Sequence, residues 1–257
     1  MRVLLIDFES TGLDTSKDRI IEIGAQIVDD QWELLASVST LVNGPDIESP
    51  SNEIQGITGI TLEEWKTHGV HLKDALDLLL LTLDADVVFA YNKDFDFPLF
   101  RTEMFRHGLG LHAVGNHFLQ IPWVCAMRDV ESNYQKKCWK LSHLALDYGI
   151  SVDPSRLHRA IDDVDLMRRM LKAAGSSPQE IFNFSIQPWI IVRALVPPPW
   201  EDAGKGKDIV RKLGYSWQEP KGTSLFFEKS WVKRIKESWL DEEIKKVPYP
   251  IRQIKES

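Results

Sequence analysis

Three strand-like runs open the chain and constrain its fold more than any other feature. Residues 3–6 form a short apolar run that is typical of a buried strand and ends at Asp7. Two longer runs follow at residues 20–28 and 33–42, and the polar residues 29–31 between them suit a hairpin connection. We therefore expect a sheet that starts with antiparallel strands.

A helical pattern and a further strand follow these runs. The leucines between residues 72 and 83, with aspartates among them, favour a helix with a wide apolar face that packs on the sheet. Residues 87–91 are typical of the next strand, and residues 97–107 of a helix whose first turn tolerates Pro98. The predicted order is three strands, a helix, a strand and a helix.

Two later segments complete the first predicted domain. Helical patterns cover residues 140–148 and 159–174, and each is followed by a glycine suited to a C-terminal cap, Gly149 and Gly175. The Ser-Ser-Pro segment after the second glycine then marks the expected domain end. The sequence therefore predicts a first domain at residues 1–175.

The remainder of the chain has the composition of a linker and a small module. Residues 176–203 are the predicted linker, because three prolines at 197–199 are stiff and the Gly- and Lys-rich stretch that follows is flexible. A small module is expected at residues 204–257. Within it, residues 219–222 suit a hairpin turn between two aromatic segments.

The charge distribution matters more than the net charge of −7, which alone argues against a nucleic-acid partner. Residues 204–257 hold 13 Lys and Arg against 8 Asp and Glu, a local charge of +5. Residues 1–203 hold 18 against 30, or −12. The chain therefore combines an acidic body with a basic tail.

The basic tail also contains many aromatic rings. Cations and rings together suit single-stranded nucleic acid, because bases stack on rings while cations contact phosphates. The same rings equally suit the core of a small domain with solvated lysines, and the sequence leaves both interpretations open. The residues concerned are Lys205, Lys207, Arg211, Lys212, Lys229, Lys233, Arg234 and Lys236, with Tyr215, Trp217, Phe226, Phe227, Trp231 and Trp239.

Cysteine content and apolar runs bear on the compartment. Cys125 and Cys138 fit no zinc pattern, and free thiols in a reducing compartment are the default expectation. The N-terminus reaches the carboxylates of Asp7 and Glu9 before a signal-peptide core is complete, so we expect no secretion signal. No apolar run approaches the roughly 20 residues of a membrane span, so a soluble, cytoplasmic protein without a membrane partner is expected.

The first candidate site follows the opening strand. Alternation along an extended chain places Asp7 and Glu9 on the same face, so their carboxylates converge. A lone Asp-x-Glu pair is a weak signal, because exposed acids are common. This pair is stronger because it follows a strand with the pattern of a buried one.

Two further candidate sites lie at helix starts. Asp96 follows a strand and begins a helix, where an ordinary role would be N-terminal capping. His158 precedes the helix that contains Asp162 and Asp163, and these acids could simply interact with the helix dipole. Each site taken alone has an ordinary structural explanation.

Taken together, the three segments resemble the three motifs of DnaQ-like 3′-to-5′ exonucleases of the DEDDh type, in the same order and chain separation. A Thr-Gly-Ile-Thr segment at residues 58–61 and a Lys-Leu-x-x-Leu segment at residues 140–144 are also similar to that family. The resemblance covers residues 1–175. The matching motif residues are Asp7 to Leu13 for the first motif, Asn92, Phe95 and Asp96 for the second, and His158, Ala160 and Asp163 for the third.

The resemblance implies an α/β fold of the ribonuclease H-like kind with a mixed central sheet. It implies two divalent cations, Mg²⁺ or Mn²⁺, for which carboxylate oxygens are suitable ligands. It assigns general-base catalysis to His158, since an imidazole titrates near neutrality. By resemblance the metal ligands are Asp7, Glu9, Asp96 and Asp163, and the substrate-binding residues are Thr11, Gly12, Leu13, Asn92 and Phe95.

The motif spacing selects Asp163 over Asp162 as the ligand after His158, and leaves Asp162 and Asp165 with ordinary surface roles.

The implied reaction is release of nucleoside 5′-monophosphates from the 3′ ends of DNA, expected to be single-stranded. An RNA-trimming exonuclease stays open, because nothing in the sequence reads the 2′-hydroxyl group. A non-catalytic nucleic-acid-binding protein or polymerase-associated scaffold is the alternative of another class, and the oligomeric state is left open.

Overall fold

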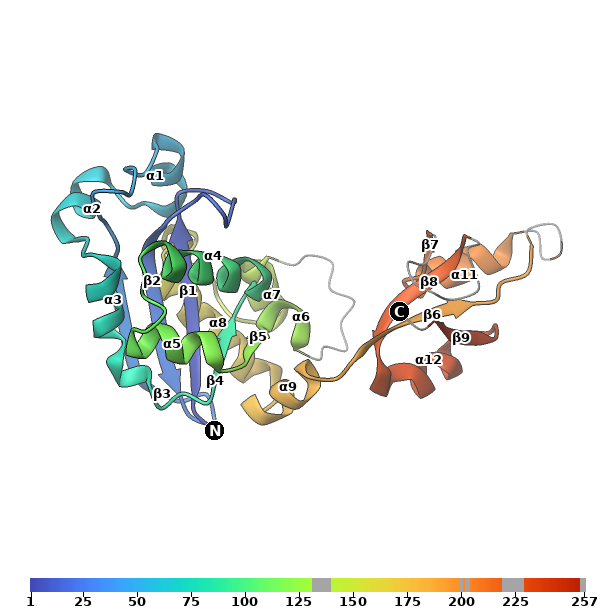
Figure 1. The fold of residues 1–257 in the computed structure, drawn as a ribbon. Helices are drawn as coiled ribbons and strands as arrows, with labels where there is room; N and C mark the ends of the chain where they lie inside the picture. The colour runs from blue at the N-terminus through green and yellow to red at the C-terminus, as the bar shows by residue number, and fades with distance from the viewer. Residues whose placement is uncertain (131–139, 199–200, 202–203, 219–228, 255–257) are drawn as a thin grey trace. The chain divides into compact units, whose positions relative to one another are not determined.

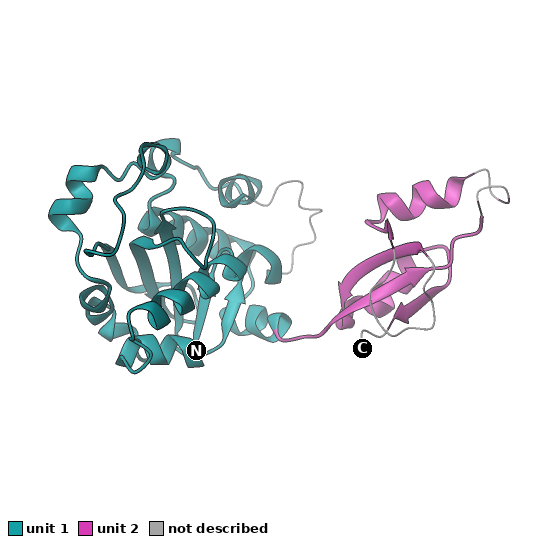
Figure 2. Cartoon of the chain, turned by 45° about the horizontal axis from the view of Figure 1, so that its top comes forward, with its two compact units in different colours: residues 1–185 teal, residues 186–257 magenta. Residues whose placement is uncertain are grey.

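The chain forms two compact units, residues 1–185 and residues 186–257 (Figure 2). The computed structural model describes residues 1–130, 140–198, 201, 204–218 and 229–254. Cys138, Phe226, Phe227 and the predicted turn at residues 219–222 therefore lie outside the described residues. Cys125 is buried and is a free cysteine.

A mixed five-stranded sheet lies at the centre of the first unit, in the order β3-β2-β1-β4-β5 (Figure 1). The first three strands pair antiparallel, as the sequence predicts, and the last two run parallel to β1. The strands are β1 (Val3–Ser10), β2 (Ile20–Val28), β3 (Leu34–Leu41), β4 (Val87–Ala90) and β5 (Trp123–Cys125). The predicted α/β fold with a mixed sheet is confirmed.

Both faces of this sheet are covered by helices because β1 is apolar on both faces. Leu4 and Ile6 pack into a core with α3, α4 and α5. Val3 and Leu5 pack into a second core with α7, α8 and α9 on the other face. The helices are α3 (Leu72–Leu78), α4 (Lys93–Arg106), α5 (Ala113–Gln120), α7 (Leu141–Asp147), α8 (Ala160–Ala174) and α9 (Pro178–Ser185).

The shorter helices of this unit complete the connections between strands. Ser51 and Thr61 cap the N-termini of α1 (Asn52–Thr58) and α2 (Leu62–His68) with their side-chain oxygens. The others are α6 (Ala126–Asp129) and the 3₁₀ segments η1 (Leu80–Thr82) and η2 (Pro154–Arg156).

Two predicted helices differ from the structure at their ends. The helix predicted at residues 72–83 ends at Leu78, and η1 replaces its last turn. The helix predicted at residues 97–107 starts earlier, at Lys93, because the carbonyl of Asn92 accepts the first helical hydrogen bonds. Pro98 therefore lies inside α4, beyond the first turn.

The two glycine caps are confirmed. Gly149 follows α7 with φ +73°, and Gly175 caps α8 with φ +82°. Both values lie in the left-handed region, where a glycine has no Cβ to clash with the backbone.

The predicted linker at residues 176–203 needs correction. Residues 178–185 form α9, whose Ile181 is buried in the core beside α8. Residues 189–194 form β6 of the second unit, with alternating burial along the strand. Apolar periodicity at these positions outweighs the proline and glycine content on which the linker prediction depended.

The second unit is a four-stranded antiparallel sheet in the order β7-β8-β6-β9. Its core packs Ile190, Val192 and Ile235 of the sheet against Val210 of α11 and Val247 after α12. The elements are β6 (Trp189–Ala194), α11 (Lys205–Lys212), β7 (Ser216–Gln218), β8 (Ser230–Lys236), η3 (Glu237–Trp239), α12 (Leu240–Lys246) and β9 (Ile251–Ile254).

Among the described residues of both units, no helix combines the length and apolarity that crossing a bilayer requires.

Candidate active site

Asp7 and Glu9 lie at the end of the central strand β1, on the face that α8 covers. Val3 and Leu5 occupy earlier positions on that face and are buried against α8, and alternation places the two acids in line with them. One carboxylate oxygen each from Asp7, Glu9 and Asp163 lies within 4.8 Å of the others. The structure thus brings the predicted pair together with a third carboxylate from α8.

The neighbours of Asp163 on α8 have other partners. Asp162, the rival position in the sequence, forms an ion pair with Arg156. Asp165 pairs with arginines of its own helix. The acidic group found among the described residues therefore contains Asp163 and neither of these two acids.

His158 lies just before α8 in a left-handed conformation, with φ +64°. Such a φ is uncommon for residues other than glycine, and such outliers gather at functional sites. The backbone N–H of His158 donates to Oδ2 of Asp163 at 3.3 Å, while the residue as a whole is exposed. The imidazole is therefore accessible beside the acidic group.

Asp96 is a buried carboxylate in the first turn of α4. Its backbone N–H donates to the carbonyl oxygen of Asn92 at 3.1 Å, which fixes the start of the helix. Burial, and next the charge of neighbouring Asp96, raise the pKa of Asp7 well above its ordinary value. Asp96 thus acts electrostatically on the group formed by Asp7, Glu9 and Asp163.

The other carboxyl groups of the site are also harder to ionise than usual. Burial, and then the charge of Asp163, raise the pKa of Glu9 to about 8. Burial raises the pKa of Asp96 to about 8 and that of Asp163 to about 6. Clustered oxygen ligands whose negative charges repel one another fit a hard divalent cation, which would offset that repulsion.

Contacts between β2 and α8 hold the third motif against the first. Glu22 is buried, and its Oε2 accepts a hydrogen bond from the backbone N–H of Ala160 at 3.0 Å. The Arg159 guanidinium binds Glu22 at 2.8 Å and Glu64 of α2 at 3.2 Å. A Cβ on Gly24 would lie 2.3 Å from the carbonyl carbon of Ala160, so α8 rests directly on the strand.

Sequence reasoning missed these three supporting residues. Glu22 could have been noticed, because it is the one charged residue in the apolar run at residues 20–28. Arg159 stands inside the third motif, but nothing in the local pattern identifies its partners. Gly24 gave no signal, since a strand glycine has several ordinary explanations.

The predicted nucleotide-binding residues of the first motif lie in the loop between β1 and β2. Leu13 is 87 % exposed. The Thr11 hydroxyl donates to Oδ1 of Asp18 at 3.0 Å and accepts from the backbone N–H of Arg19 at 2.9 Å. A Cβ on Gly12 would lie 2.6 Å from Oδ2 of Asp18, so a larger residue here would have to displace the Asp18 carboxylate.

Asn92 and Phe95 have different surroundings. Asn92 is exposed, and its side chain makes no capping hydrogen bond to α4. Phe95 is half-buried and packs against the core on the α4 side of the sheet. The structure therefore leaves the Asn92 amide accessible and gives Phe95 a packing role.

A groove lies beside His158, between the end of α1 and the η2 segment. It brings the Thr-Gly part of the Thr-Gly-Ile-Thr segment close to the third motif, although 99 positions separate Gly59 from His158 in the sequence. Its lining residues are Gly56, Ile57, Thr58, Gly59, Pro154, Ser155, Leu157 and His158.

The second unit pairs cations with aromatic rings. The Trp217 and Trp231 ring centroids are 5.5 Å apart, and the Arg211 guanidinium lies 5.8 Å from the Trp231 ring. Tyr215 is buried in the core, whereas Trp217 is 56 % exposed. Tyr215 therefore has the packing role, and the nucleic-acid interpretation stays open for the exposed Trp217.

The RNase_T family model, described as Exonuclease, matches residues 4–170. The chain belongs to this exonuclease family. The match contains all three motifs and ends within α8. The family resemblance seen in the sequence and the predicted class, a nuclease of the exonuclease type, are confirmed.

Two curated relatives of this exonuclease are named DNA polymerase III PolC-type. The one from Thermotoga maritima is 30 % identical over 166 residues, and the one from Thermotoga petrophila is 29 % identical over 161 residues. Each alignment covers 62 % of this chain and 11 % of the relative. The chain therefore spans about a tenth of the length of these curated relatives.

Solved structures of E. coli exonuclease I share the fold. The complex with a dA16 oligonucleotide superimposes with a TM-score of 0.61 at 15 % identity, over 97 % of this chain and 68 % of that one. The zinc-bound complex with ssDNA gives a TM-score of 0.58 at 18 % identity, over 75 % of this chain and 48 % of that one. These similarities confirm the predicted ribonuclease H-like architecture.

Proposed function

We propose that this protein is a metal-dependent 3′-to-5′ exonuclease that releases nucleoside 5′-monophosphates from single-stranded DNA ends. The observation that carries the proposal is the convergence of Asp7, Glu9 and Asp163, with Asp96 beside Asp7, on the fold of an exonuclease family. Carboxylates gathered at this density repel one another, so their proximity suits a site that works with cations.

Asp7, Glu9, Asp96 and Asp163 would hold two divalent cations, Mg²⁺ or Mn²⁺. When bound, such cations supply Lewis-acid stabilisation of the charge that develops on the phosphate and on the leaving oxygen. Within the chain, the contacts of Glu22 with Arg159 and Ala160 hold the start of α8, the helix that carries Asp163, against β2. The extended backbone of β1 holds the side chains of Asp7 and Glu9 on one face of the sheet.

His158 would accept the proton of the attacking water. Its imidazole is exposed beside the acidic group, and its backbone is tied to Asp163. A proton acceptor must come within hydrogen-bond reach of the water in the substrate complex, and an exposed side chain can do so by rotation. In this proposal Asp163 places the base as well as serving as a ligand.

Single-stranded DNA is the proposed substrate because of the relatives. Two carry the name of a DNA polymerase, and the fold is that of exonuclease I crystallised with DNA oligonucleotides. The exposed Leu13 and the accessible Asn92 would contact the terminal nucleotide. The cytoplasmic location predicted from the sequence remains a prediction.

Cation–ring pairs of the second unit would hold the strand away from the reacting end. Trp217 is exposed enough for a base to stack on it, and Arg211 lies close to its neighbour Trp231. Lys233 contributes to the core instead, because it binds Glu243 and lies 5.6 Å from the ring of Tyr215. Only some of the cations are therefore assigned to nucleic acid.

Matched DNA and RNA oligonucleotides, assayed side by side with Mg²⁺ or Mn²⁺, test this proposal. We expect mononucleotide release from DNA and its suppression by a chelator. Faster release of mononucleotides from RNA would show that RNA, and not DNA, is the preferred substrate. Binding of either oligonucleotide with no release under any of these cations would favour the scaffold alternative.

A further inference from the structure

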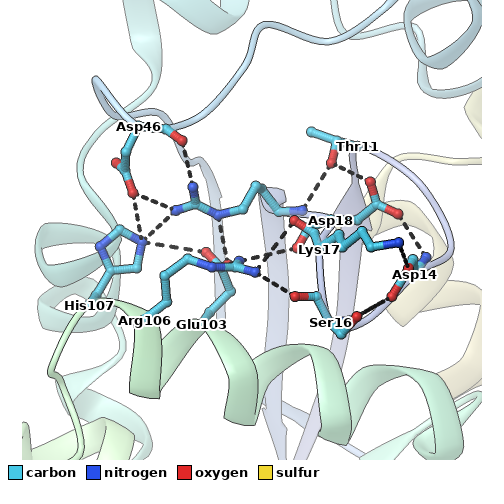
Figure 3. A network of polar contacts seen from close by, with 10 residues as sticks. Thr11, Asp14, Ser16, Lys17, Asp18, Asp46, Glu103, Arg106 and His107 are labelled. Atoms are coloured by element: carbon cyan, nitrogen blue, oxygen red, sulfur yellow. Dashed lines mark hydrogen bonds and ion pairs between the residues drawn. The ribbon is translucent and has the colours of Figure 1, made fainter.

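The loop between β1 and β2 is fastened to the last turn of α4 by Arg106 (Figure 3). Nη2 of Arg106 donates to the carbonyl oxygens of Ser16 at 3.0 Å and Lys17 at 3.4 Å, and Nη1 donates to that of Asp18 at 3.3 Å. A planar guanidinium can serve several acceptors at once, which an ammonium cannot do in the same geometry. Three consecutive carbonyls of the loop thus share one side chain.

The anchor of this arrangement is Glu103, which is fully buried in α4. Its Oε1 accepts from Arg106 and also from Nε of Arg19 at 2.8 Å. Arg19 extends the network by donating to the backbone carbonyl of Asp46 at 2.6 Å. A buried carboxylate is costly unless it is paired and hydrogen-bonded, so this pairing fixes both arginines relative to α4.

Inside the loop, the carboxylate of Asp18 holds other loop residues in place. This carboxylate accepts from the Thr11 hydroxyl at 3.0 Å and from the backbone N–H of Asp14 at 2.7 Å. The hydroxyl oxygen of Thr11 also accepts a hydrogen bond from the backbone N–H of Arg19. Leu13 lies between these fixed points and projects into solvent. A single exposed leucine is common, but here the backbone on both sides is held by side chains.

We propose that Arg106, held by Glu103, is a positioning residue for substrate binding: it keeps the loop at residues 11–18 in the shape that receives the terminal nucleotide. The inference rests on the proposed function, because it takes Thr11 and Leu13 as contacts of that nucleotide. Arg106 stands ten positions after Asp96 on α4, a rise of about 15 Å along the helix. Its replacement therefore changes binding and leaves the chemical step in place.

The key variants are Arg106→Lys and Arg106→Ala, with Arg101→Ala as the matched control. A lysine at position 106 keeps a positive charge beside Glu103 but cannot donate to three carbonyls at once. Arg106→Lys therefore removes the hydrogen bonds that hold the loop while it still neutralises the buried acid. Arg101 lies on the same helix, is exposed and contacts the ring of Phe97 at 5.9 Å. Its removal changes the net charge equally.

The first measurement is the Kd of a fluorescent single-stranded DNA trinucleotide with Ca²⁺ present, together with KM and kcat in Mg²⁺. We expect both Arg106 variants to weaken Kd and raise KM by about tenfold, or about 1.4 kcal/mol, and to change kcat by less than about twofold. Arg101→Ala should match the parent in all three quantities.

The second measurement is hydrogen exchange of the free protein. The backbone N–H groups of Asp14, Lys17 and Asp18 are hydrogen-bonded within the loop, so they should exchange faster in both Arg106 variants. This readout needs no activity. If the parent releases no nucleotide but the variants weaken Kd and loosen the loop, the proposed function fails and the positioning role stands.

Three outcomes would overturn the positioning role. One is an unchanged Kd and unchanged loop exchange in Arg106→Lys. Another is a loss of kcat with KM unchanged, which would place Arg106 in the chemistry. The third is a parent protein that does not bind the trinucleotide at all.

Discussion

Gly24 of β2 lies directly against the first turn of α8, so that a Cβ at this position would come within 2.3 Å of the carbonyl carbon of Ala160. Contacts this short do not occur, so any larger residue must push the helix away from the sheet. Asp7 pairs with Gly24 across the ladder between β1 and β2. The glycine therefore sets the distance between the first motif and the third.

We expect Gly24→Ala to separate Asp163 and His158 from Asp7. A displacement of about 1 Å at a reacting group costs up to about 100-fold in rate, and overpacking costs about 1–3 kcal/mol of stability. The measurements are turnover and urea unfolding. Gly110→Ala is the control, since a Cβ there meets nothing within 4 Å. Near-parental turnover in Gly24→Ala would show that α8 can shift without harm.

The raised pKa values predict how the metal-free protein responds to pH. Glu9 and Asp96 have pKa values of about 8 in the folded state, above the ordinary values that apply when the chain is unfolded. The folded state therefore binds more protons between about pH 4 and pH 8, and the free energy of unfolding falls as pH rises through this range. We expect the melting temperature to fall accordingly.

Divalent cations and a charge-removing variant provide the checks for this trend. Mg²⁺ or Mn²⁺ should raise the melting temperature more at pH 8 than at pH 5, because more carboxylates are then ionised. Asp7→Asn should melt higher than the parent at pH 8 without metal and should respond less to cations. An apo protein whose stability rises steadily from pH 5 to pH 8 would contradict the predicted acidic cluster.

His158 requires a variant that suits its backbone. Asparagine tolerates the left-handed conformation at φ +64° better than alanine does, so His158→Asn removes the imidazole with little strain. We expect turnover to fall by roughly 10²- to 10⁴-fold while Mn²⁺ affinity is retained. Titration calorimetry and single-turnover rates separate the two effects. A parental rate in both His158→Asn and His158→Ala would remove the histidine from the mechanism.

The convergence of Asp7, Glu9 and Asp163 could be predicted from the sequence because their segments resemble motifs of a known exonuclease family. Asp7, Asp96 and Asp163 each follow a local pattern of strand end or helix start. Their supports could not be predicted in this way. Glu22 meets Arg159 across 137 positions, and Arg19 meets Glu103 across 84, so only the packed sheet and helices reveal these pairs.

The division of the chain shows a different limit of sequence analysis. Proline and glycine near residues 197–206 indicated a linker, but β6 precedes them and pairs with both β8 and β9. Strand pairing depends on residues that follow much later in the chain. The composition of a short window therefore could not show that residues 189–194 belong to the second unit.

This division also determines how the second unit should be removed. Ending the chain at residue 203 would leave β6 without its partners, so the deletion should cover residues 186–257. We expect weaker binding to a long single strand and retained turnover of a dinucleotide. Each lost phosphate contact should flatten the slope of log affinity against log salt by about 0.7.

A separate variant tests how much the aromatic rings of this unit contribute to binding of a single strand. Trp217→Ala should weaken binding by about 1–3 kcal/mol, and the loss should persist at high salt because stacking is not screened. If the deletion leaves affinity and salt slope unchanged, the second unit has no part in binding single strands.

The most direct test of the account follows a 5′-labelled single-stranded DNA with Mg²⁺ or Mn²⁺, for the parent, Asp163→Ala and Asp162→Ala. The two variants remove the same charge from adjacent positions, but only Asp163 belongs to the acidic group. We predict stepwise shortening from the 3′ end with nucleoside 5′-monophosphate as product, nearly abolished in Asp163→Ala and retained in Asp162→Ala, with both variants folded by circular dichroism. Equal rates in all three proteins, or no shortening by the parent with either cation, would contradict the account.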